Sequence, residues 1–369
     1  MSPRRAIVRV LGSVARTAVV LLVVGGVLAV VLPGGPVDLG ALDGGPDRAG
    51  YDAPAPSSDA ATETPPARPL GESPWDSAVL TVAVRNRADP GRNVTAPVAE
   101  ALTYWAGHDG YADYPAAFRL EPDATDPDVV VWYNETIDCA DHDDAIGCAP
   151  LLEVGTHVEG PIDVQIRYDP AHNRRQVRNT AIHEFGHVLG VTHCEEPYWV
   201  MASSCPRPIP DAPNADERDL AWRDGTISVF VDETNVSADD LAGTREQVGH
   251  ALAYLGDGDA EGFPANVTFV RADDRYEADV TVAFRSDLPC RESGSEDVVV
   301  CTEHRGRDFD GDGALEYHTG GTILIDADAD VDARGWYAGW ALSKVVAPGR
   351  VPTVFEDASY RERRSEWWE

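Results

Sequence analysis

Residues 183–193 read His-Glu-Phe-Gly-His-Val-Leu-Gly-Val-Thr-His, a pattern in which three imidazoles can converge on one metal ion. In a helix, His183 and His187 lie one turn apart on the same face, because side chains at i and i+4 are neighbours. Gly190 can take the left-handed conformation that ends a helix, so the chain can turn and bring back His193 as a third ligand. Three neutral imidazoles on Zn²⁺ leave the fourth position open to water, as in catalytic zinc sites.

Two further residues extend this pattern. Glu184 stands beside the first histidine, where its carboxylate can reach a water on the metal, and Met201 follows eight residues after His193. In these positions the sequence resembles the metzincin metallopeptidases, and within them the matrixin-like group, which share H-E-x-x-H-x-x-G-x-x-H followed by a methionine. The resemblance implies three histidine ligands to a catalytic zinc, Glu184 as general base, and Met201 in the Met-turn beneath the metal.

The resemblance also implies an activity, which is the hydrolysis of peptide bonds by a zinc-bound water that Glu184 activates. The chain would then be an extracellular zinc endopeptidase acting on a protein or peptide substrate. The alternative is a surface-anchored binding or structural protein in which zinc only stabilises the fold. Glu184 has no role in a purely structural site, which favours the enzyme, whereas a membrane anchor and a metal-free second half favour the alternative.

The composition of the chain is strongly acidic. Its 369 residues carry a formal net charge of −33, and Lys344 is the only lysine. An acidic, lysine-poor chain resembles the proteins of halophilic prokaryotes, since at molar salt the Debye length falls to about 3 Å and self-repulsion is screened. No basic patch is present to meet phosphates, so the sequence predicts no nucleic-acid partner.

The N-terminal residues 1–33 combine four arginines with an apolar run. Two interpretations stay open, a secretory signal or an uncleaved membrane anchor formed by residues 6–32. The positive-inside rule places the remainder outside the cell under either interpretation. Residues 34–74 are rich in Gly, Pro, Ala and Asp and predict a disordered tether.

The six cysteines fall into three local pairs and favour an oxidising compartment. Six cysteines allow several connectivities, so the local pairing is a hypothesis. The hypothetical pairs are Cys139 with Cys148, Cys194 with Cys205, and Cys290 with Cys301.

Residues 75–224 alternate apolar, β-branched runs with helical spacing, which predicts an α/β (α+β) unit with a mixed sheet. The resemblance makes this unit a matrixin-like zinc peptidase domain of metzincin-like fold. The expected strands are 79–84, 118–120, 129–133, 151–154 and 164–168, and the expected helices are 93–107, 173–189 (the metal helix) and 216–223.

Residues 225–350 repeat this pattern, which predicts a second, similar α/β unit followed by a tail over 351–369. We infer a tandem duplication whose second copy lacks the metal site. Aligning Arg334 with Arg178 sets a register for the last helix of the repeat. In that register Gly339, Trp340, Ser343 and Val346 take the places of His183, Glu184, His187 and Gly190.

The second half also contains an acidic loop with the D-x-D-x-D-G opening of a calcium site, at Asp308, Asp310 and Asp312. The twelfth position is Thr319 and not glutamate, and Glu316 at the ninth position is the substitute ligand. A Ca²⁺ site and an ordinary acidic loop both remain open.

Overall fold

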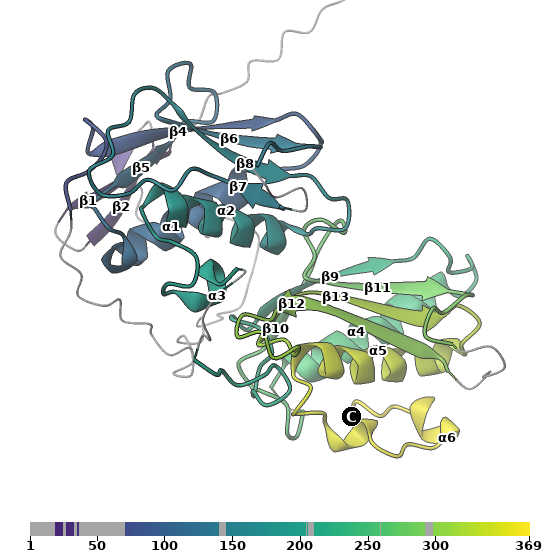
Figure 1. Ribbon diagram of the computed structural model, residues 1–369. Coiled ribbons are helices and arrows are strands. Elements are labelled where there is room, and N and C mark those ends of the chain that lie inside the picture. The colour runs from purple at the N-terminus through teal and green to yellow at the C-terminus, as the bar shows by residue number, and fades with distance from the viewer. Residues whose placement is uncertain are drawn as a thin grey trace, which may run out of the picture.

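The chain folds into two α/β units that lie side by side, each with a sheet covered on one face by helices (Figure 1). The computed structural model describes residues 71–139, 145–203, 205, 210–258, 260–291 and 298–369, together with the backbone of three short strands before residue 37. The expected fold class, a mixed α/β sheet followed by a second similar unit, is confirmed.

The first unit is built on five strands in the order β5-β4-β6-β8-β7, in which only β7 is antiparallel to its neighbour. Valine-rich runs form the central strands because β-branched side chains pack well on a pleated sheet. The elements in chain order are β4 (Val79–Asn86), α1 (Thr95–Gly107), η1 (Asp109–Tyr111), β5 (Ala117–Leu120), β6 (Val129–Asn134), β7 (Gly147–Cys148), β8 (Ile162–Arg167), α2 (Arg174–Val188) and α3 (Tyr198–Met201).

The apolar N-terminal run has an extended backbone in three places, β1 (Val19–Val24), β2 (Val27–Leu32) and β3 (Gly35–Pro36). β1 pairs antiparallel with both β2 and β5 and so extends the first sheet. The other residues of the expected anchor and tether, up to residue 70, lie outside the described part of the chain. Among the described residues, no helix is long and apolar enough to cross a membrane.

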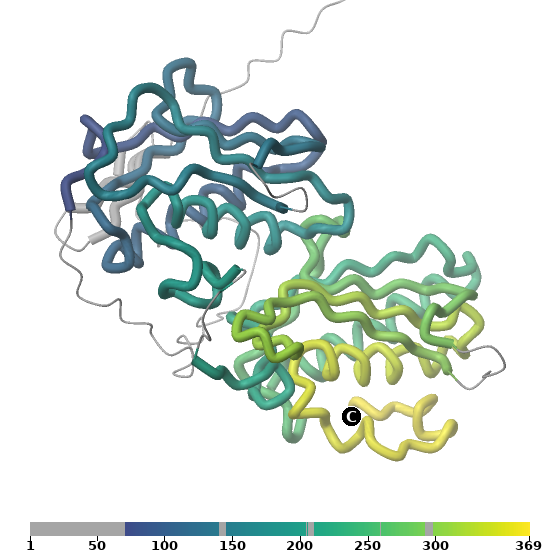
Figure 2. The backbone as a smooth tube through the Cα atoms, viewed as in Figure 1, coloured from purple at the N-terminus to yellow at the C-terminus, as the bar shows by residue number. Residues whose placement is uncertain are grey.

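The second unit has the same order of strands and helices. Its sheet runs β10-β9-β11-β13-β12, again with a single antiparallel strand at the edge. The elements are β9 (Thr226–Asp232), α4 (Leu241–Gly256), β10 (Thr268–Arg271), β11 (Val280–Arg285), β12 (Val300–Arg307), β13 (Tyr317–Asp326) and α5 (Val331–Val346). Figure 2 traces the backbone from the first unit, in blue and teal, into the second unit, in green and yellow.

Strand registers agree between the units as well. The central residue Val129 lies opposite Val82 on one side, and its counterpart Val280 lies opposite Val229. The edge strands match too, because Cys148 pairs with Gln165 on β8, and Cys301 pairs with Leu324 at the corresponding place on β13. This agreement in register supports a duplication, because two sheets that share only their strand order need not pair equivalent residues of neighbouring strands.

The helix register expected from the sequence is wrong by one residue. Counted from the N-cap residues Asn173 of α2 and Asp330 of α5, His183 corresponds to Trp340. The fully buried pairs Phe185 and Leu342, and Val188 and Val345, agree with this count. The loop that leads into α5 is shorter than the loop that leads into α2. Aligning Arg334 with Arg178 overestimates this difference in length and so shifts the helix register by one residue.

Two further expectations are wrong. Residues 151–154 form no strand, because the Leu152 N–H donates to the His187 carbonyl and not to a neighbouring strand. Residues 216–223 form turns and not a helix, since the Ala221 N–H donates to the Val346 carbonyl and the indole of Trp222 donates to the Val345 carbonyl. This segment therefore belongs to the second hydrophobic core, which includes Ala221 and Trp222.

The last residues of the chain pack on α5. They contain η2 (Thr353–Phe355) and α6 (Tyr360–Arg363), and Phe355 and Trp367 are buried in the second core. In Figure 1 this C-terminal segment lies beneath α5, on the side away from the sheet. The tail predicted over 351–369 is thus a packed part of the second unit.

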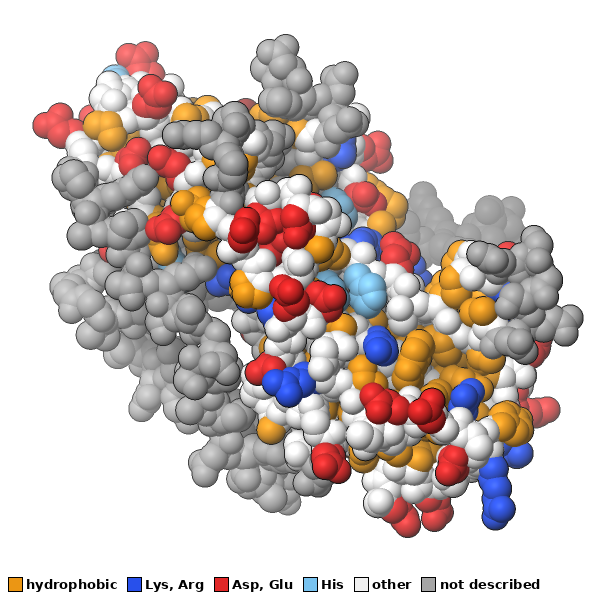
Figure 3. All heavy atoms as spheres, turned by 60° about the horizontal axis from the view of Figure 1, so that its bottom comes forward, with side chains coloured by type: hydrophobic (Ala, Val, Ile, Leu, Met, Phe, Trp, Pro, Cys, Tyr) orange, Lys and Arg blue, Asp and Glu red, His pale blue; other side chains and the backbone are white. Residues whose placement is uncertain are grey.

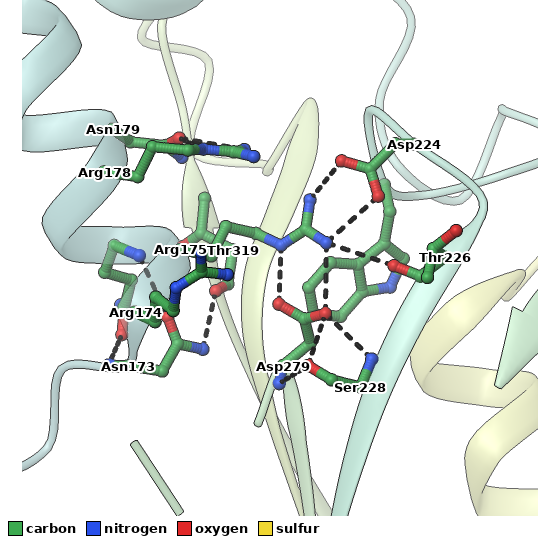
Figure 4. A network of polar contacts seen from close by, with 12 residues as sticks. Asn173, Arg174, Arg175, Arg178, Asn179, Asp224, Thr226, Ser228, Asp279 and Thr319 are labelled. Atoms are coloured by element: carbon green, nitrogen blue, oxygen red, sulfur yellow. Dashed lines mark hydrogen bonds and ion pairs between the residues drawn. The ribbon is translucent and has the colours of Figure 1, made fainter. Parts of the chain in front are cut away.

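The N-terminal end of α2 docks on the second unit through a network of polar contacts (Figure 4). Arg175 forms ion pairs with Asp279, Nε to Oδ1 at 2.6 Å, and with Asp224, and the side chains of Arg175 and Asp279 are each 9% exposed. Asp279 in turn accepts hydrogen bonds from Ser228, and the Asn173 amide donates to the Thr319 carbonyl. The two units are therefore joined at the helix that carries the metal motif.

Acidic side chains are distributed over the face shown in Figure 3 and do not form one cluster.

Candidate metal centre

Helix α2 is fixed at both ends by capping motifs. Asn173 and Gln176 form a reciprocal capping box at its start. At its end, the Gly190 N–H donates to the His187 carbonyl and the Val191 N–H to the Gly186 carbonyl, which together make a Schellman motif. Gly190 has a φ of 87°, and a Cβ at this residue would lie 2.8 Å from the Cβ of Asp113. Glycine is therefore required for the turn that brings His193 back.

The structure brings the three expected histidines together. The Nε2 atoms of His183 and His187 each lie 3.1 Å from Nε2 of His193. One nitrogen from each ring lies within 4.8 Å of the other two. His183 and His187 come from one face of α2 and His193 from the loop beyond Gly190, as the spacing of the motif predicts.

The hydrogen bonds of two rings fix which nitrogen is free to bind a cation. Nδ1 of His183 donates to the Val200 carbonyl at 2.7 Å, and Nδ1 of His187 donates to the Val191 carbonyl at 2.9 Å. In a neutral imidazole the other nitrogen then carries a lone pair and no proton. The Nε2 atoms of His183 and His187 therefore carry no proton while these rings are neutral. Each can bind a cation through its lone pair.

Burial keeps these rings neutral. It lowers the pKa of His183 to about 3, with the neighbouring His187 adding to the effect. It lowers the pKa of His187 to about 4, and the bond to Val191 opposes this shift. Neutral imidazole is the form that binds a metal, so protons compete weakly for these ligands near neutral pH.

The ligand set fits zinc. Nitrogens about 2.0–2.1 Å from a tetrahedral zinc ion stand about 3.3 Å apart, close to the separation of the Nε2 atoms here. Three imidazoles also leave one coordination position free for water or substrate. A His triad of this geometry can hold a divalent transition metal.

Glu184 lies against the edge strand of the sheet. Its side chain is 4% exposed, and a Cβ on Gly147 of β7 would collide with its Oε1 atom. Burial raises the pKa of Glu184 to about 8, while the Ala149 N–H and the Arg307 guanidinium act to lower it. The carboxyl group can thus both accept and give a proton near neutral pH.

Met201 lies under the metal helix. Its side chain is fully buried, and a Cβ on Gly186 would lie 2.6 Å from Met201 Sδ and 3.0 Å from the Trp105 ring. The Trp105 indole donates to the Ile182 carbonyl of the same helix at 2.8 Å. Gly186 therefore allows Met201 and Trp105 to pack directly on the helix backbone.

The loop that carries Met201 is closed by the disulfide Cys194–Cys205, and the Cys194 N–H donates to the Met201 carbonyl. The disulfide Cys139–Cys148 closes the segment that leads to β7, and Cys290–Cys301 closes the equivalent segment of the second unit. All three are the local pairs expected from the sequence, and they fit an oxidising compartment.

One residue of the site was not expected from the sequence. Arg307, at the end of β12 in the second unit, donates from Nη2 to the Val200 carbonyl at 2.7 Å. The same carbonyl accepts the hydrogen bond from His183. No local pattern links Arg307 to a motif more than a hundred residues earlier, so only the docking of the two units reveals it.

The four acidic side chains of the loop in the second half also lie close to one another. A carboxylate oxygen from each of Asp308, Asp310, Asp312 and Glu316 lies within 4.8 Å of the others. Thr319, the twelfth residue of the calcium pattern, lies in β13 and donates from its hydroxyl to the Arg305 carbonyl.

Comparisons with known proteins add little to this geometry. No family model and no curated protein matches the chain. Two solved structures of myroilysin match with 18% sequence identity and a TM-score of 0.21, over 34% of this chain. The chain spans less than half of either myroilysin structure, 44% of one and 46% of the other. The functional assignment therefore rests on the site itself.

Proposed function

We propose that this chain is an exported zinc endopeptidase in which His183, His187 and His193 hold the metal and Glu184 is the general base. One observation carries the proposal. Three imidazole nitrogens converge, two of them freed by Nδ1 bonds to carbonyls, and the same helix carries the buried carboxyl group of Glu184 against the edge strand β7. A purely structural site would need no such carboxyl group beside its ligands.

The edge strand β7 supplies the argument for a peptide substrate. It is the last strand of the first sheet and pairs only with β8 among the described strands. An extended peptide can add to such an edge through main-chain hydrogen bonds. Because Glu184 contacts Gly147 of this strand, a peptide added there would present its backbone close to the carboxyl group.

The chemistry of the residues fits hydrolysis. A zinc ion held by the three imidazoles would supply a Lewis acid that polarises a carbonyl and acidifies water. Glu184 accepts a proton from the attacking water and gives it to the leaving amine. A pKa near neutrality suits a residue that must do both. A cation held by the three imidazoles would bring the pKa of Glu184 down from about 8, toward neutrality.

The test is cleavage of casein and of a peptide library by the zinc-loaded full chain, in molar salt, with the metal content measured. We expect Glu184→Gln to keep its zinc and to lose roughly 10²–10⁴-fold in cleavage rate. The matched control is Glu261→Gln, which removes an exposed carboxylate of the second unit and should leave the rate unchanged.

A wild-type chain that binds zinc tightly yet cleaves nothing would contradict the proposal. That result would favour the structural alternative, in which the metal only holds α2 and its following loop together.

A further inference from the structure

The β12–β13 hairpin of the second unit reaches the metal centre of the first. Arg307 ends β12 and bonds to the Val200 carbonyl, and Phe309 packs against the first hydrophobic core. Between Arg307 and the start of β13 lies the acidic loop, residues 308–316. An interaction that orders this loop therefore also keeps the side chains of Arg307 and Phe309 in contact with the first unit.

The loop presents four carboxylates to a common point. Asp308, Asp310 and Asp312 alternate along the chain, and Gly313 follows with a φ of 93°, which suits a sharp turn. No arginine, lysine or histidine of the described chain forms an ion pair with any of the four acids. Within the described part of the chain, no cationic side chain compensates their mutual repulsion.

Glu316 is the observation that points to a ligand. Its side chain is 0% exposed, and its Oε2 atom accepts a hydrogen bond from the Phe309 N–H at 2.6 Å. Its Oε1 atom is buried and has no hydrogen-bond partner among the described residues, and one oxygen of this carboxylate lies within 4.8 Å of an oxygen of each aspartate. An unsatisfied buried carboxylate oxygen is costly, and a bound cation removes that cost.

The same carboxylates fasten the hairpin to the chain that follows the Met-turn. The Ala212 N–H donates to Asp310 Oδ2, and the Asn214 amide donates to Asp312 Oδ2. The Ala215 N–H donates to the Leu315 carbonyl. A loop ordered around a cation would therefore also order the segment that links the two units.

Arg307 transmits this order to the metal ligands. Its guanidinium is partly buried and donates to the Val200 carbonyl, which also accepts the Nδ1 hydrogen of His183. Holding this carbonyl holds the His183 ring with its Nε2 atom toward the other two imidazoles. Partners of this kind, which orient a ligand without touching the metal, affect metal affinity by roughly 10–100-fold.

We propose that residues 308–316 bind a Ca²⁺ ion through Asp308, Asp310, Asp312 and Glu316, and that this ion holds Arg307 where it positions His183. The second half of this statement rests on the function proposed for the histidine triad. Ca²⁺ fits because all four donors are carboxylate oxygens and Ca²⁺ accepts irregular coordination, whereas Mg²⁺ demands a tighter octahedral arrangement.

The first experiment is calorimetric titration of the full chain with CaCl₂ in molar NaCl, beside MgCl₂. We expect a single Ca²⁺ site, with affinity reduced at least tenfold in Asp310→Asn and unchanged in Glu261→Gln. Ca²⁺ should also raise the melting temperature of the wild type and of Glu261→Gln, but not of Asp310→Asn. Absence of a Ca²⁺ site, or the same affinity in Asp310→Asn, would overturn the proposal.

The second experiment measures Co²⁺ affinity at the histidine triad by visible absorption, with and without Ca²⁺. Ca²⁺ should tighten Co²⁺ binding by roughly fivefold or more, and Co²⁺ should tighten Ca²⁺ binding by the same factor. The effect should vanish in Arg307→Met and be partly restored in Arg307→Lys. An unchanged Co²⁺ affinity in a chain that binds Ca²⁺ would overturn the role given to Arg307.

The two proposals fail separately. A chain that binds no Co²⁺ at the triad would overturn the proposed function and the coupling with it. The Ca²⁺ titration would still decide whether the loop is a cation site, because that measurement makes no use of the triad.

Discussion

Helix α2 of the first unit and helix α5 of the second follow equivalent strands, yet they present different chemistry at equivalent positions. Where α2 has His183, Glu184 and His187, α5 has Trp340, Ala341 and Lys344. The sheets beneath them agree in strand order and register. The backbone thus supports a metal site or an ordinary core equally well, and the side chains decide which forms.

The coverings of the two helices differ as well. The disulfide-closed loop with Met201 packs on α2 at Gly186, while Phe355 and Trp367 from the C-terminal residues pack on α5 at Gly339. The first covering leaves three imidazole nitrogens facing one another, and the second fills the space with aromatic rings. The same arrangement of strands and helices is therefore compatible with a histidine cluster in one unit and an aromatic core in the other.

The largest expected effect separates the two helices by function. In His187→Ala, bound zinc should be lost and cleavage should fall by more than roughly 100-fold, the loss that even an outer partner of a metal ligand can cause. The matched change in the second unit, Lys344→Ala, should alter neither. Metal analysis and a peptide cleavage assay check both variants. Loss of zinc in Lys344→Ala would contradict the assignment of the metal to α2 alone.

The next effect tests whether the units stand alone. Arg175→Met leaves Asp279 buried with no guanidinium partner, so we expect a loss of roughly 3–5 kcal/mol in unfolding free energy. Denaturant unfolding should then show two separated transitions, one for each unit. The double variant Arg175→Met with Asp279→Asn should recover much of the loss. A single transition at unchanged denaturant concentration would show that the ion pair does not join the units.

A pH effect is expected from the second unit. His318 is 7% exposed, and burial lowers its pKa to about 4, with the Val345 carbonyl opposing and His304 adding to the shift. Between pH 6.5 and 4 the unfolded chain binds a proton that the folded chain does not. The contribution of His318 to stability is therefore fully present above pH 6.5 and is lost as the pH falls toward 4, which amounts to about 3 kcal/mol for this residue.

The variant His318→Asn should flatten this dependence, since an amide can still donate to Val345 but does not titrate. Unfolding curves collected from pH 7 to 4 check it, with the exposed His157→Asn as the control. An identical pH dependence in wild type and His318→Asn would assign the acid sensitivity to other groups.

The smallest effect compares the two helix glycines. Gly186→Ala places a Cβ 2.6 Å from Met201 Sδ, and Gly339→Ala would place one against the Phe355 ring at 2.5 Å. Each should lower stability by about 1–3 kcal/mol through overpacking. Only Gly186→Ala should also weaken zinc binding. Thermal melts and a zinc competition assay distinguish them, and equal zinc affinities would show that the packing of Met201 does not affect the ligands.

Local patterns predicted most of the fold. The β-branched strands, the metal helix and the three cysteine pairs follow from residues close together in the sequence. Residues 151–154 and 216–223 were misjudged because their backbone groups bond to distant carbonyls, those of His187 and Val346. Local propensity carries no information about such partners.

In the candidate site, too, the features set by local sequence were predictable and those set by distant contacts were not. The histidine triad lies within eleven residues, so its spacing alone predicts its convergence. Gly147 beside Glu184 and Arg307 beside Val200 depend on how the edge strand and the second unit dock, which no motif encodes. Gly186 is a weaker sequence indicator of the site than the histidines. A glycine inside a helix lowers stability by about 1 kcal/mol relative to alanine, so its presence suggests close packing at that position.

The position of Arg307 has a consequence for biosynthesis. All three imidazoles have been synthesised by residue 193, but the guanidinium that holds the Val200 carbonyl follows more than a hundred residues later. During vectorial synthesis or export the chain therefore carries its complete ligand set before it has the residue that orients His183. If Arg307 positions His183 as proposed, the histidine cluster reaches its final geometry only after the second unit has emerged and folded.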